Sequence, residues 1–511
     1  MLFKGCGSIQ SITEGYTYIY IGSEKGGLKR FNLYGKYFDN PITTAQGLKD
    51  NTITAVHFDK STGFIWAASP NDIQYSFSRE GDWYPISLKS MGLSHRDKIL
   101  QIGSSNNYIW LKARSSYVKL DHNSGTLIGI YPRPDELEIN WSSTKYEGQK
   151  EIKKILNEYV VMDSWTILGD ELIDKLGRRV DVSTGYIAQH DDVYIGLENG
   201  IILHGSRVME TLIPIYPDIP NDDISALYNF DNHLWIGSQN YLDSKGITKL
   251  DINSLETSIY TFEETINMQP TSIRSLQSTK KQLFAGGNDV LLYFDMDRDY
   301  WRTLDESQGA PGGVIWDICL TEPYLWMGSS KGLRILNTMT LTPESLGIEN
   351  FFHDVPVYDF QDVGNEIWIG SNVGLFIYSN NDPKLIRASD YAKSISIANF
   401  TKVTSIEYFR DDIYVAGRMG IAKFDLKEKE WTVIARQSQY DNNIVYSMAI
   451  NDKFIFLGTR EGLTRINKRS GLVRDYNYTF IGSVNDIFLD KTIIWLGTST
   501  GLIKFKWKKD L

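Results

Sequence analysis

One short phrase recurs along the whole chain, and it constrains the fold more than any other feature. Each copy combines an apolar residue, an aromatic residue, a second apolar residue and glycine, and after a turn it resumes with glycine and an apolar residue. The aromatic positions of the eleven recognisable copies are Tyr20, Trp66, Trp110, Tyr194, Trp235, Phe284, Trp326, Trp368, Tyr414, Phe456 and Trp495. Self-similarity at a period of about 20 to 50 residues is the signature of propellers and solenoids.

The spacing of the copies predicts how many units the chain holds. Most successive aromatics are 39 to 49 residues apart, whereas Trp110 and Tyr194 are separated by 84, which is twice 42. This interval predicts one diverged copy, around Trp165. The chain is therefore expected to contain about twelve units, which account for its whole length.

Each unit is expected to form four strands. The apolar-aromatic-apolar run is typical of a short buried strand, and the glycine turn followed by renewed alternation predicts a hairpin. An inner strand is indicated by an apolar residue eleven positions before most of the aromatics, namely Ile9, Ile99, Ile224, Ile273, Ile315, Val357, Val403 and Val484. A fourth strand fits after the turn that contains aspartate, as in FDLKEKEWTVI from Phe424. Four strands in about 40 residues make a propeller blade.

The predicted fold class is therefore all-β, with tandem β-propellers of four-stranded blades and about twelve blades in total. The composition agrees, since 30 Tyr, 13 Trp and 42 Gly against 14 Pro favour strands joined by glycine-containing turns. The recurrent aromatics, glycines and aspartates are assigned to packing, close approach and turns. They specify the fold, so no ligand-binding residue is predicted from them.

The division into rings follows from the regularity of the copies. Seven well-formed copies begin at Trp235, and seven is a usual blade number, so residues 215–511 are predicted to form a C-terminal seven-bladed propeller. Residues 1–214 are predicted to form an N-terminal propeller of about five blades, one of them diverged, with an irregular segment at 132–180. Because the last copy ends before a fourth strand, its ring must borrow one. Residues 206–219 are a candidate donor, although they also suit the fourth strand of the blade at Tyr194. An arrangement of six plus six blades is the alternative.

The irregular segment carries mixed charge. Its stretch EGQKEIKKILNE, residues 147–158, suits a short amphipathic helix within an insertion or a degenerate blade. An element that binds a partner is the functional interpretation, because inserted loops on a rigid scaffold often carry recognition.

Motifs that would indicate catalysis or metal binding are absent from the sequence. The histidines, at positions His57, His95, His122, His190, His204, His233 and His353, show no metal-ligand spacing. Only Cys6 and Cys319 are present, which excludes a disulfide framework, and there is no nucleophile elbow or phosphate loop. DMDRDYW from Asp295 could suggest calcium but falls at the turn of a repeat, and SREGDW from Ser78 is a single copy similar to the Asp-box turn. No catalytic residue, metal site or cofactor is predicted.

The charge of the chain bears on its partners. A formal net charge of −10 and a pI near 5.4 argue against nucleic-acid binding, which needs a basic face. The one basic run, Lys504, Lys506, Lys508 and Lys509, is interpreted as a solvated end. No apolar run is long enough for a transmembrane segment, and the first residues lack the apolar stretch of a signal peptide. The chain is therefore expected to be cytoplasmic, or to have lost a leader.

The repeat itself resembles a known family. The phrases IWIGSNVGLFIYS from Ile367, LWMGSSKGLRIL from Leu325 and IWLGTSTGLIKF from Ile494 closely resemble the two-component-regulator propeller repeat. Such repeats form the extracytoplasmic sensor regions of hybrid two-component systems, and related tandem propellers occur in a surface component of type IX secretion. The resemblance implies a periplasmic or cell-surface location and non-catalytic recognition of a protein partner or a glycan. A carbohydrate-active enzyme with its active site in a cleft between propellers is the alternative.

Overall fold

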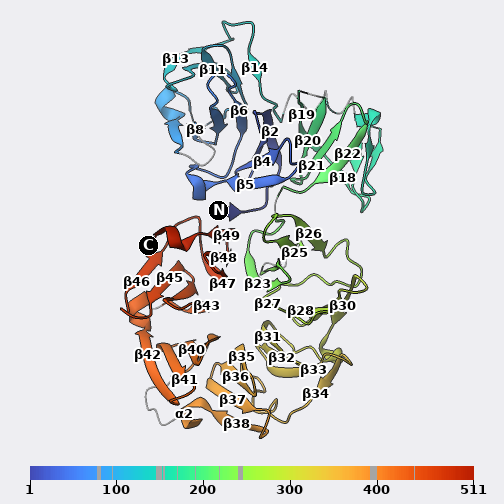
Figure 1. Cartoon of the computed structure of the whole chain (residues 1–511). Coiled ribbons are helices and arrows are strands. Elements are labelled where there is room, and N and C mark those ends of the chain that lie inside the picture. Colours follow the sequence, from blue (N-terminus) through green and yellow to red (C-terminus); the bar gives the residue numbers. More distant parts are fainter. Residues whose placement is uncertain are drawn as a thin grey trace. The chain divides into compact units, whose positions relative to one another are not determined.

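The strands of the computed structural model assemble into antiparallel sheets in which neighbours along the chain pair with each other (Figure 1). The structure describes residues 1–511 except 78–81, 95, 146–151, 153–155, 170, 190, 218, 240–244, 392–399, 442 and 511. Two compact units are distinguished, which we call unit 1 (Met1–Pro220 and Leu255–Thr257) and unit 2 (Asn221–Ser254 and Ser258–Leu511). The all-β propeller class predicted from the sequence is confirmed. The predicted domain boundary at residue 214 stays a prediction.

Unit 2 contains seven blades. Their strands, blade by blade, are β23 (Ile224–Phe230), β24 (His233–Ser238), β25 (Gly246–Asp251) and β26 (Thr257–Thr261); β27 (Ser275–Ser278), β28 (Gln282–Gly286), β29 (Leu291–Asp295) and β30 (Tyr300–Leu304); β31 (Ile315–Thr321), β32 (Tyr324–Ser329), β33 (Gly332–Asn337) and β34 (Thr342–Glu344); β35 (Val357–Val363), β36 (Glu366–Ser371), β37 (Gly374–Ser379) and β38 (Lys384–Arg387); β39 (Ser405–Phe409), β40 (Asp412–Gly417), β41 (Gly420–Asp425) and β42 (Glu430–Arg436); β43 (Val445–Ile450), β44 (Phe454–Thr459), β45 (Gly462–Asn467) and β46 (Val473–Tyr476); and β47 (Val484–Asp490), β48 (Ile493–Thr498) and β49 (Gly501–Phe505). A four-residue helix, α2 (Ala388–Tyr391), follows β38.

The blades of unit 2 form a closed ring. The first strand of each blade packs against the first strand of the next, in the order β23, β27, β31, β35, β39, β43 and β47, and β47 packs against β23. Figure 1 shows these strands around the centre of the ring, with β30, β34, β38, β42 and β46 at its periphery. All seven regular copies seen in the sequence thus belong to one ring.

Unit 1 begins with β1 (Leu2–Phe3) and contains four larger sheets. Their strands are β2 (Ile9–Glu14), β3 (Tyr18–Ser23), β4 (Leu28–Asn32) and β5 (Phe38–Ile42); β6 (Ala55–Phe58), β7 (Ile65–Ala68), β8 (Asp72–Ser76) and β9 (Tyr84–Ser87); β10 (Gln101–Ser104), β11 (Tyr108–Lys112), β12 (Tyr117–Asp121), β13 (Leu127–Tyr131) and β14 (Asn140–Trp141); and β15 (Val160–Val161), β19 (Val182–Ile187), β20 (Asp192–Leu197), β21 (Ile202–Ser206) and β22 (Thr211–Ile215). A three-stranded sheet of β16 (Thr166–Leu168), β17 (Glu171–Ile173) and β18 (Arg179–Val180) completes the unit.

The diverged copy expected around Trp165 is not a four-stranded blade in the described residues. That part of the chain supplies β15, which pairs in parallel with β22, and the small sheet β16 to β18. Residues 142 and 143, which follow β14, lie between the inner strands β10 and β19, where the inner strand of the missing blade would be expected. Gln101 Nε2 on β10 donates to the Ser142 carbonyl at 2.7 Å, and Thr184 Oγ1 on β19 donates to Ser143 Oγ at 2.9 Å. The 84-residue interval thus holds the length of a blade without the repeated phrase, and whether it is an insertion or a degenerate blade stays open.

Two further expectations concern neighbouring segments. Residues 206–219 are not a donor to the last blade, because β22 pairs with β21 along its whole length and is the fourth strand of the blade at Tyr194. The amphipathic helix expected at 147–158 lies largely outside the described residues, of which Leu156–Glu158 form a 3-10 turn.

The two sequence patterns of the repeat meet at the interfaces between blades. The glycine of each phrase faces the apolar residue at the start of the next blade, and a Cβ on that glycine would lie 2.4 to 2.9 Å from the apolar side chain. The pairs in unit 2 are Gly237 with Ile273, Gly286 with Ile315, Gly328 with Val357, Gly370 with Val403, Gly458 with Val484 and Gly497 with Ile224. The last pair joins the final blade to the first. Glycine is thus favoured in these six blades because the inner strand of the next blade approaches closely, and Ala416 takes the position in the remaining blade.

The recurrent aromatics fill the same interfaces. All eleven lie in the second strand of a sheet, and Trp326, for example, contacts Phe360 and Tyr378 of the following blade at ring-centroid distances of 6.5 and 5.4 Å. Removing a side chain of this size from water contributes roughly 4 to 6 kcal/mol. Their assigned role in packing agrees with these contacts.

Candidate functional site

Five of the seven inner strands of unit 2 begin with a β-bulge, and seven side chains take equivalent positions at the starts of the inner strands. The register with the second strand shifts between Ile224 and Ala226 in the first blade, and the same shift occurs at the start of β31, β35, β43 and β47. In the other two blades Arg274 and Thr404 take this position and donate their amides to the carbonyls of Gly286 and Ala416. We call the seven residues the bulge ring: Ser225, Arg274, Trp316, Tyr358, Thr404, Tyr446 and Asn485. Bulges re-aim side chains and are frequent beside active sites.

Three neighbouring members of the bulge ring contact one another. The guanidinium of Arg274 lies 4.6 Å from the centroid of the Trp316 ring, and Trp316 and Tyr358 approach with centroids 6.1 Å apart. Arg274 Nε and Trp316 Nε1 have no hydrogen-bond partner among the described residues. Tyr446 is 42 % exposed. The ring therefore offers aromatic side chains, which interfaces and ligand sites use most.

Polar residues at the edge of the bulge ring hold Arg274 and Asn485. Arg274 Nη1 donates to Gln239 Oε1 at 3.3 Å, and Asn485 Nδ2 donates to Asp223 Oδ1 at 3.2 Å. Burial raises the pKa of Asp223, against the hydrogen bond from Asn485 and the charge of Arg274. Burial lowers the pKa of Arg274, and Asp223 opposes this shift. The partially desolvated charge of Arg274 is thus fixed beside the Trp316 ring.

One residue further along, six of the seven inner strands carry a serine or an aspartate, and hydrogen bonds from these side chains join the blades. Asp317 Oδ2 accepts the Phe360 amide of the next blade at 3.0 Å, and Asp486 Oδ2 accepts the Leu227 amide at 2.7 Å, which closes the ring. The equivalent residues Asp359, Ser275 and Ser447 accept the amides of Ile406, Ile318 and Ile487. We call Ser275, Asp317, Asp359, Ser405, Ser447 and Asp486 the belt. A side-chain acceptor for an exposed backbone amide satisfies that donor, so the belt has a structural role.

The acidic groups on the inner strands have raised pKa values. Burial raises the pKa of Asp486 to about 6, despite its hydrogen bonds. Burial, together with the charges of Asp486 and Asp317, raises the pKa of Glu407 to about 8. The pKa values of Asp317 and Asp359 are also raised by burial, and each affects the other. Carboxyl groups that are half-buried without a counter-charge favour the protonated form.

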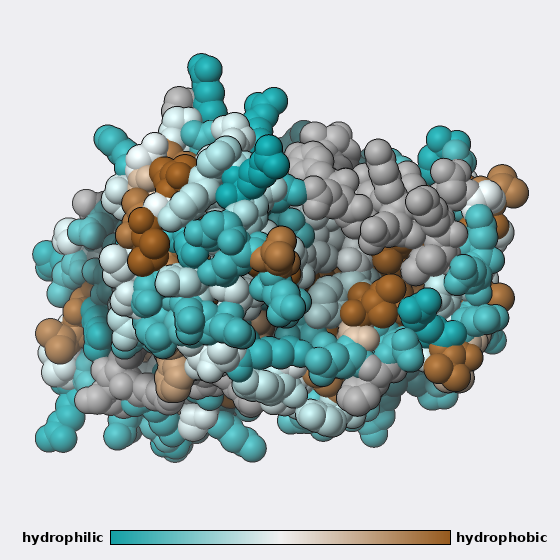
Figure 2. Space-filling view, turned by 90° about the horizontal axis from the view of Figure 1, so that it is seen from above, coloured by the Kyte–Doolittle hydropathy of each residue, from teal (hydrophilic) through white to brown (hydrophobic). Residues whose placement is uncertain are grey.

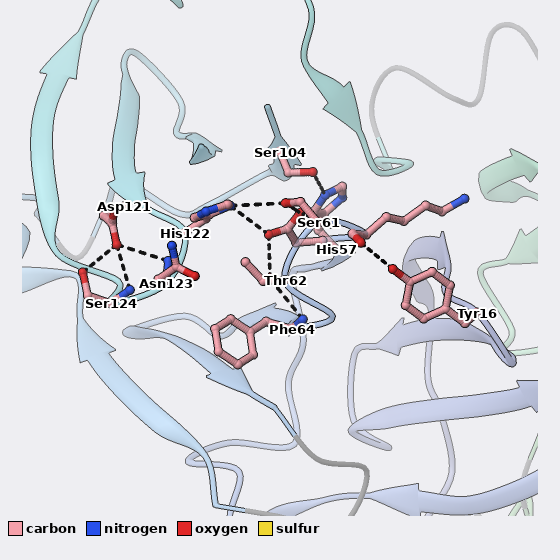
Figure 3. Close-up of polar contacts among 12 residues, drawn as sticks. Tyr16, His57, Ser61, Thr62, Phe64, Ser104, Asp121, His122, Asn123 and Ser124 are labelled. Atoms are coloured by element: carbon pink, nitrogen blue, oxygen red, sulfur yellow. Dashed lines mark hydrogen bonds and ion pairs between the residues drawn. The ribbon is translucent and has the colours of Figure 1, made fainter. Parts of the chain in front are cut away.

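A second polar cluster, in unit 1, allows a test for nucleophilic catalysis (Figure 3). His57 Nε2 lies 2.8 Å from Ser104 Oγ, burial lowers the pKa of His57 to about 4, and its Nδ1 has no partner among the described residues. Without an acid on Nδ1 the imidazole lacks the group that orients a catalytic base. The contact instead joins β6 to β10.

A second histidine of this cluster, His122, contacts a carboxylate and a hydroxyl through the same ring nitrogen. His122 Nδ1 lies 3.3 Å from Asp59 Oδ2 and 3.2 Å from Ser61 Oγ, and Ser61 itself donates to Asp59 at 2.6 Å. A triad needs the base to hold the hydroxyl and the acid with different nitrogens. Figure 3 shows Ser61 and Thr62 folded back in the same turn, so this arrangement is a turn joined to the Asp121–Ser124 turn of the next blade.

The other positions singled out in the sequence are placed as follows. Asp295 accepts the amides of Asp297 and Arg298 at 3.1 and 3.2 Å and thus closes a turn. Within the described ranges no group of three or more His, Cys, Asp or Glu could hold a metal ion. The stretch 78–81, which begins the Asp-box-like sequence, and His95 and His190 lie outside the described residues. Among the described residues no helix is long and apolar enough to cross a membrane.

One face of the molecule is shown in Figure 2, where hydrophobic residues appear as separate small groups among hydrophilic ones. Broad contiguous apolar patches mark many interaction surfaces. On the part of this face that is coloured, no such patch stands out. The bulge ring remains the best-defined cluster of interaction-prone side chains.

No family model matches the chain, and no curated protein matches it. Among solved structures, the extracellular domain of the putative hybrid two-component system BT4673 from B. thetaiotaomicron is 12% identical and aligns over 99% of this chain and 70% of that one, with a TM-score of 0.45. The computationally designed Ika8 protein is 13% identical over 62% of this chain and 94% of that one, with a TM-score of 0.42. The WD40 β-propeller domain of Doa1 is 14% identical over 55% and 92%, with a TM-score of 0.41.

Proposed function

We propose that this protein is a non-catalytic recognition protein, which binds a protein partner or a glycan through the bulge ring of unit 2. The observation that carries the proposal is the contrast between neighbouring positions of the same strands. Five of the six belt residues accept backbone amides of the next blade, whereas the side chains of Arg274, Trp316, Tyr358 and Tyr446 in the bulge ring take no part in this belt of hydrogen bonds.

A periplasmic or cell-surface setting, associated with sensing or secretion, is part of this proposal. It is supported by the resemblance of the repeat to the two-component-regulator propeller family. The carbohydrate-active alternative would need a pair of facing carboxylates on exposed loops, and no observation on the described residues of either unit favours it.

The experiment uses a matched pair of exposed tyrosines. Tyr446 in the bulge ring is 42 % exposed and Tyr478, outside it, is 54 % exposed, so alanine at either position has little folding cost. The chain and both variants are applied to a glycan microarray and used as bait in cell-envelope extracts, with thermal unfolding as the control for folding. An aromatic at the centre of an interface contributes about 2 kcal/mol or more.

The expected result is at least a tenfold loss of binding for Tyr446→Ala and unchanged binding for Tyr478→Ala. Trp316→Ala is expected to weaken the same ligand. Equal binding by the two tyrosine variants would overturn the proposal, because the bulge ring would then not contact the ligand.

A further inference from the structure

Two arginines occupy the same position of the repeat in different units. Arg30 lies on β4, in the phrase GLKRFN, and Arg465 lies on β45, in the phrase GLTRIN. Both are buried, at 4 % and 8 % exposure. Each guanidinium lies over the aromatic ring that begins the preceding strand, 5.3 Å from the centroid of Tyr18 and 4.5 Å from that of Phe454. The surroundings of the two arginines can therefore be compared directly.

Arg30 has its counter-charge within its own blade. Asp39 lies directly opposite on β5, and Arg30 Nη2 is 4.0 Å from Asp39 Oδ2. Arg30 Nε and Nη2 also donate to the Asn40 carbonyl, at 3.1 and 2.8 Å. Tyr18 holds the acid in place, since its hydroxyl donates to Asp39 Oδ2 at 2.7 Å. A buried charge is tolerated when it is paired and hydrogen-bonded in this way.

Arg465 has no such partner. The residue opposite it on β46 is a second arginine, Arg474. Among the described residues the Arg465 side chain forms no hydrogen bond and no ion pair, and its Nη1 is fully buried without a partner. The adjacent acid, Asp475, lies opposite Thr464 and accepts from Thr464 Oγ1 at 2.5 Å, so it belongs to the other face of the sheet. Arg465 thus has the burial of Arg30 without its carboxylate.

Aromatic rings hold Arg465 but do not replace an acceptor. Its guanidinium lies 4.5 Å from the centroid of Phe454 and 5.8 Å from that of Tyr476. Rings attract a cation, yet a guanidinium carries five N–H donors and does not lose its proton. Burying those donors without acceptors is costly. Of the three nitrogens only Nη1 is both fully buried and without a partner, so Nε and Nη2 retain access to solvent.

More positive charge lies around this guanidinium. The exposed Arg474 lies 5.1 Å from the centroid of Tyr476, so one ring contacts two guanidiniums. Trp507 contacts the Phe454 ring at 5.6 Å, and the exposed Lys508 lies 5.6 Å from the centroid of Trp507. Like charges directly opposite one another on two strands are destabilising. This part of an otherwise acidic protein therefore attracts an anion.

We propose that Arg465 is the centre of a carboxylate-binding site on the sixth blade of unit 2, and that its ligand is the acidic side chain of a protein partner. The ligand carboxylate takes the place that Asp39 has beside Arg30. The planar fork of a guanidinium matches the two oxygens of a carboxylate, and the edge with Nε and Nη2 is the one that remains open. A glutamate on a flexible stem can pass Arg474 and reach a guanidinium at this depth, whereas a carboxyl group fixed to a sugar ring is shorter.

The site is separate from the bulge ring. Arg465 and Arg474 lie on β45 and β46, the third and fourth strands of their blade, whereas the bulge ring belongs to the first strands (Figure 1). The proposal therefore does not rest on the proposed function. It adds a second surface of unit 2 through which an acidic protein is recognised.

The test measures binding to the full chain by isothermal titration calorimetry at low ionic strength. The main probe is the pentapeptide Gly-Gly-Glu-Gly-Gly with both termini blocked, and Gly-Gly-Gln-Gly-Gly, blocked in the same way, is its neutral control. Acetate and glucuronate distinguish a free acid and an acidic sugar from a peptide side chain. Arg465→Met removes the guanidinium and keeps an unbranched apolar side chain. Its matched control is Arg334→Met, at an exposed arginine on the third strand of another blade.

A second variant tests the site without emptying it. Arg474→Asp places a carboxylate opposite Arg465, as Asp39 is opposite Arg30. It is expected to raise the unfolding temperature of the free protein, because the buried guanidinium gains an acceptor. It is also expected to block the external ligand. A purely structural role of Arg465 would not link these two effects.

The expected result is binding of the glutamate peptide and not of the glutamine peptide. Both Arg465→Met and Arg474→Asp should weaken this binding at least tenfold, and Arg334→Met should leave it unchanged within about twofold. Absence of binding by every carboxylate probe, or equal losses in Arg465→Met and Arg334→Met, would overturn the site. Tighter binding of acetate or glucuronate than of the glutamate peptide would overturn the protein side chain as the source of the carboxylate.

Discussion

The ring of seven blades in unit 2 predicts a specific energetic coupling between residues 273 positions apart in the sequence. Gly497 in the last blade faces Ile224 at the start of the first, and a Cβ on Gly497 would lie 2.9 Å from Ile224 Cγ2 and 3.3 Å from its carbonyl oxygen. The first contact is tighter than almost all real Cβ contacts. Gly497→Ala therefore forces the first and last blades apart.

The magnitude follows from overpacking. Extra methyl groups in a packed interface cost about 1 to 3 kcal/mol, and the loss of glycine flexibility in the unfolded chain returns about 0.4 to 1 kcal/mol. A net loss of about 1 to 2 kcal/mol is expected. Alanine is found at the equivalent position of another blade, Ala416, so the fold is expected to survive the substitution.

The assay is a double-mutant cycle read by chemical denaturation of the full chain. Ile224→Ala alone should cost about 2 to 5 kcal/mol, because it empties the same interface. In that background Gly497→Ala should cost close to nothing, which gives a coupling energy of about 1 to 2 kcal/mol. Gly497→Ala combined with Ile273→Ala, in a different interface, should be additive within about 0.5 kcal/mol. Additivity of Gly497→Ala with Ile224→Ala would refute the ring order.

Three further outcomes are expected. The pKa of Glu407 is about 8 in the folded state, which is above its unfolded value, so deprotonation of Glu407 destabilises the fold. Calorimetry should show unit 2 losing stability as the pH rises from about 4.5 to 8, by at most a few kcal/mol at about 1.4 kcal/mol per pKa unit. Glu407→Gln should flatten this trend. His57, whose pKa is lowered to about 4, gives the opposite pH dependence: unit 1 should lose stability as the pH falls from about 6.5 to 4. His57→Gln should remove that loss. If the unfolding transition of unit 1 does not change over this pH range, the buried neutral imidazole is contradicted. Trp368→Ala, which empties a fully buried site, should lower the free energy of unfolding by about 3 to 5 kcal/mol in denaturant titrations, and a change below about 1 kcal/mol would argue against its packing role.

The fold could be predicted from the sequence because the residues of its two strongest patterns pack against each other at the interface between blades. The glycine after each aromatic and the apolar residue eleven positions before the next aromatic are visible separately, and the structure shows that they touch, as Gly328 and Val357 do. At nearly every blade, the spacing of these residues in the sequence therefore matches the contacts that they make between blades. The exception is the interval around Trp165, where the length fits a blade but the repeated phrase is missing.

The candidate site could not be predicted in the same way. Its members, such as Arg274, Thr404 and Tyr446, come from different strands and share no residue type, because the bulge position does not contribute to packing. A bulge also adds one residue to the strand, so an alternation of period two assigns these side chains to the wrong face. The belt did leave a signal, since Asp317, Asp359 and Asp486 each lie two residues after the apolar residue in otherwise apolar strands.

The most direct test of recognition through the bulge ring is photo-crosslinking from single positions. A photoreactive phenylalanine analogue in place of Tyr446 reports contact at the bulge ring, and the same analogue in place of Tyr478 reports contact elsewhere on unit 2. The account predicts that the ligand captured by the unmodified chain crosslinks from position 446 and not from position 478. Crosslinking from position 478 alone, or equally from both, would contradict it.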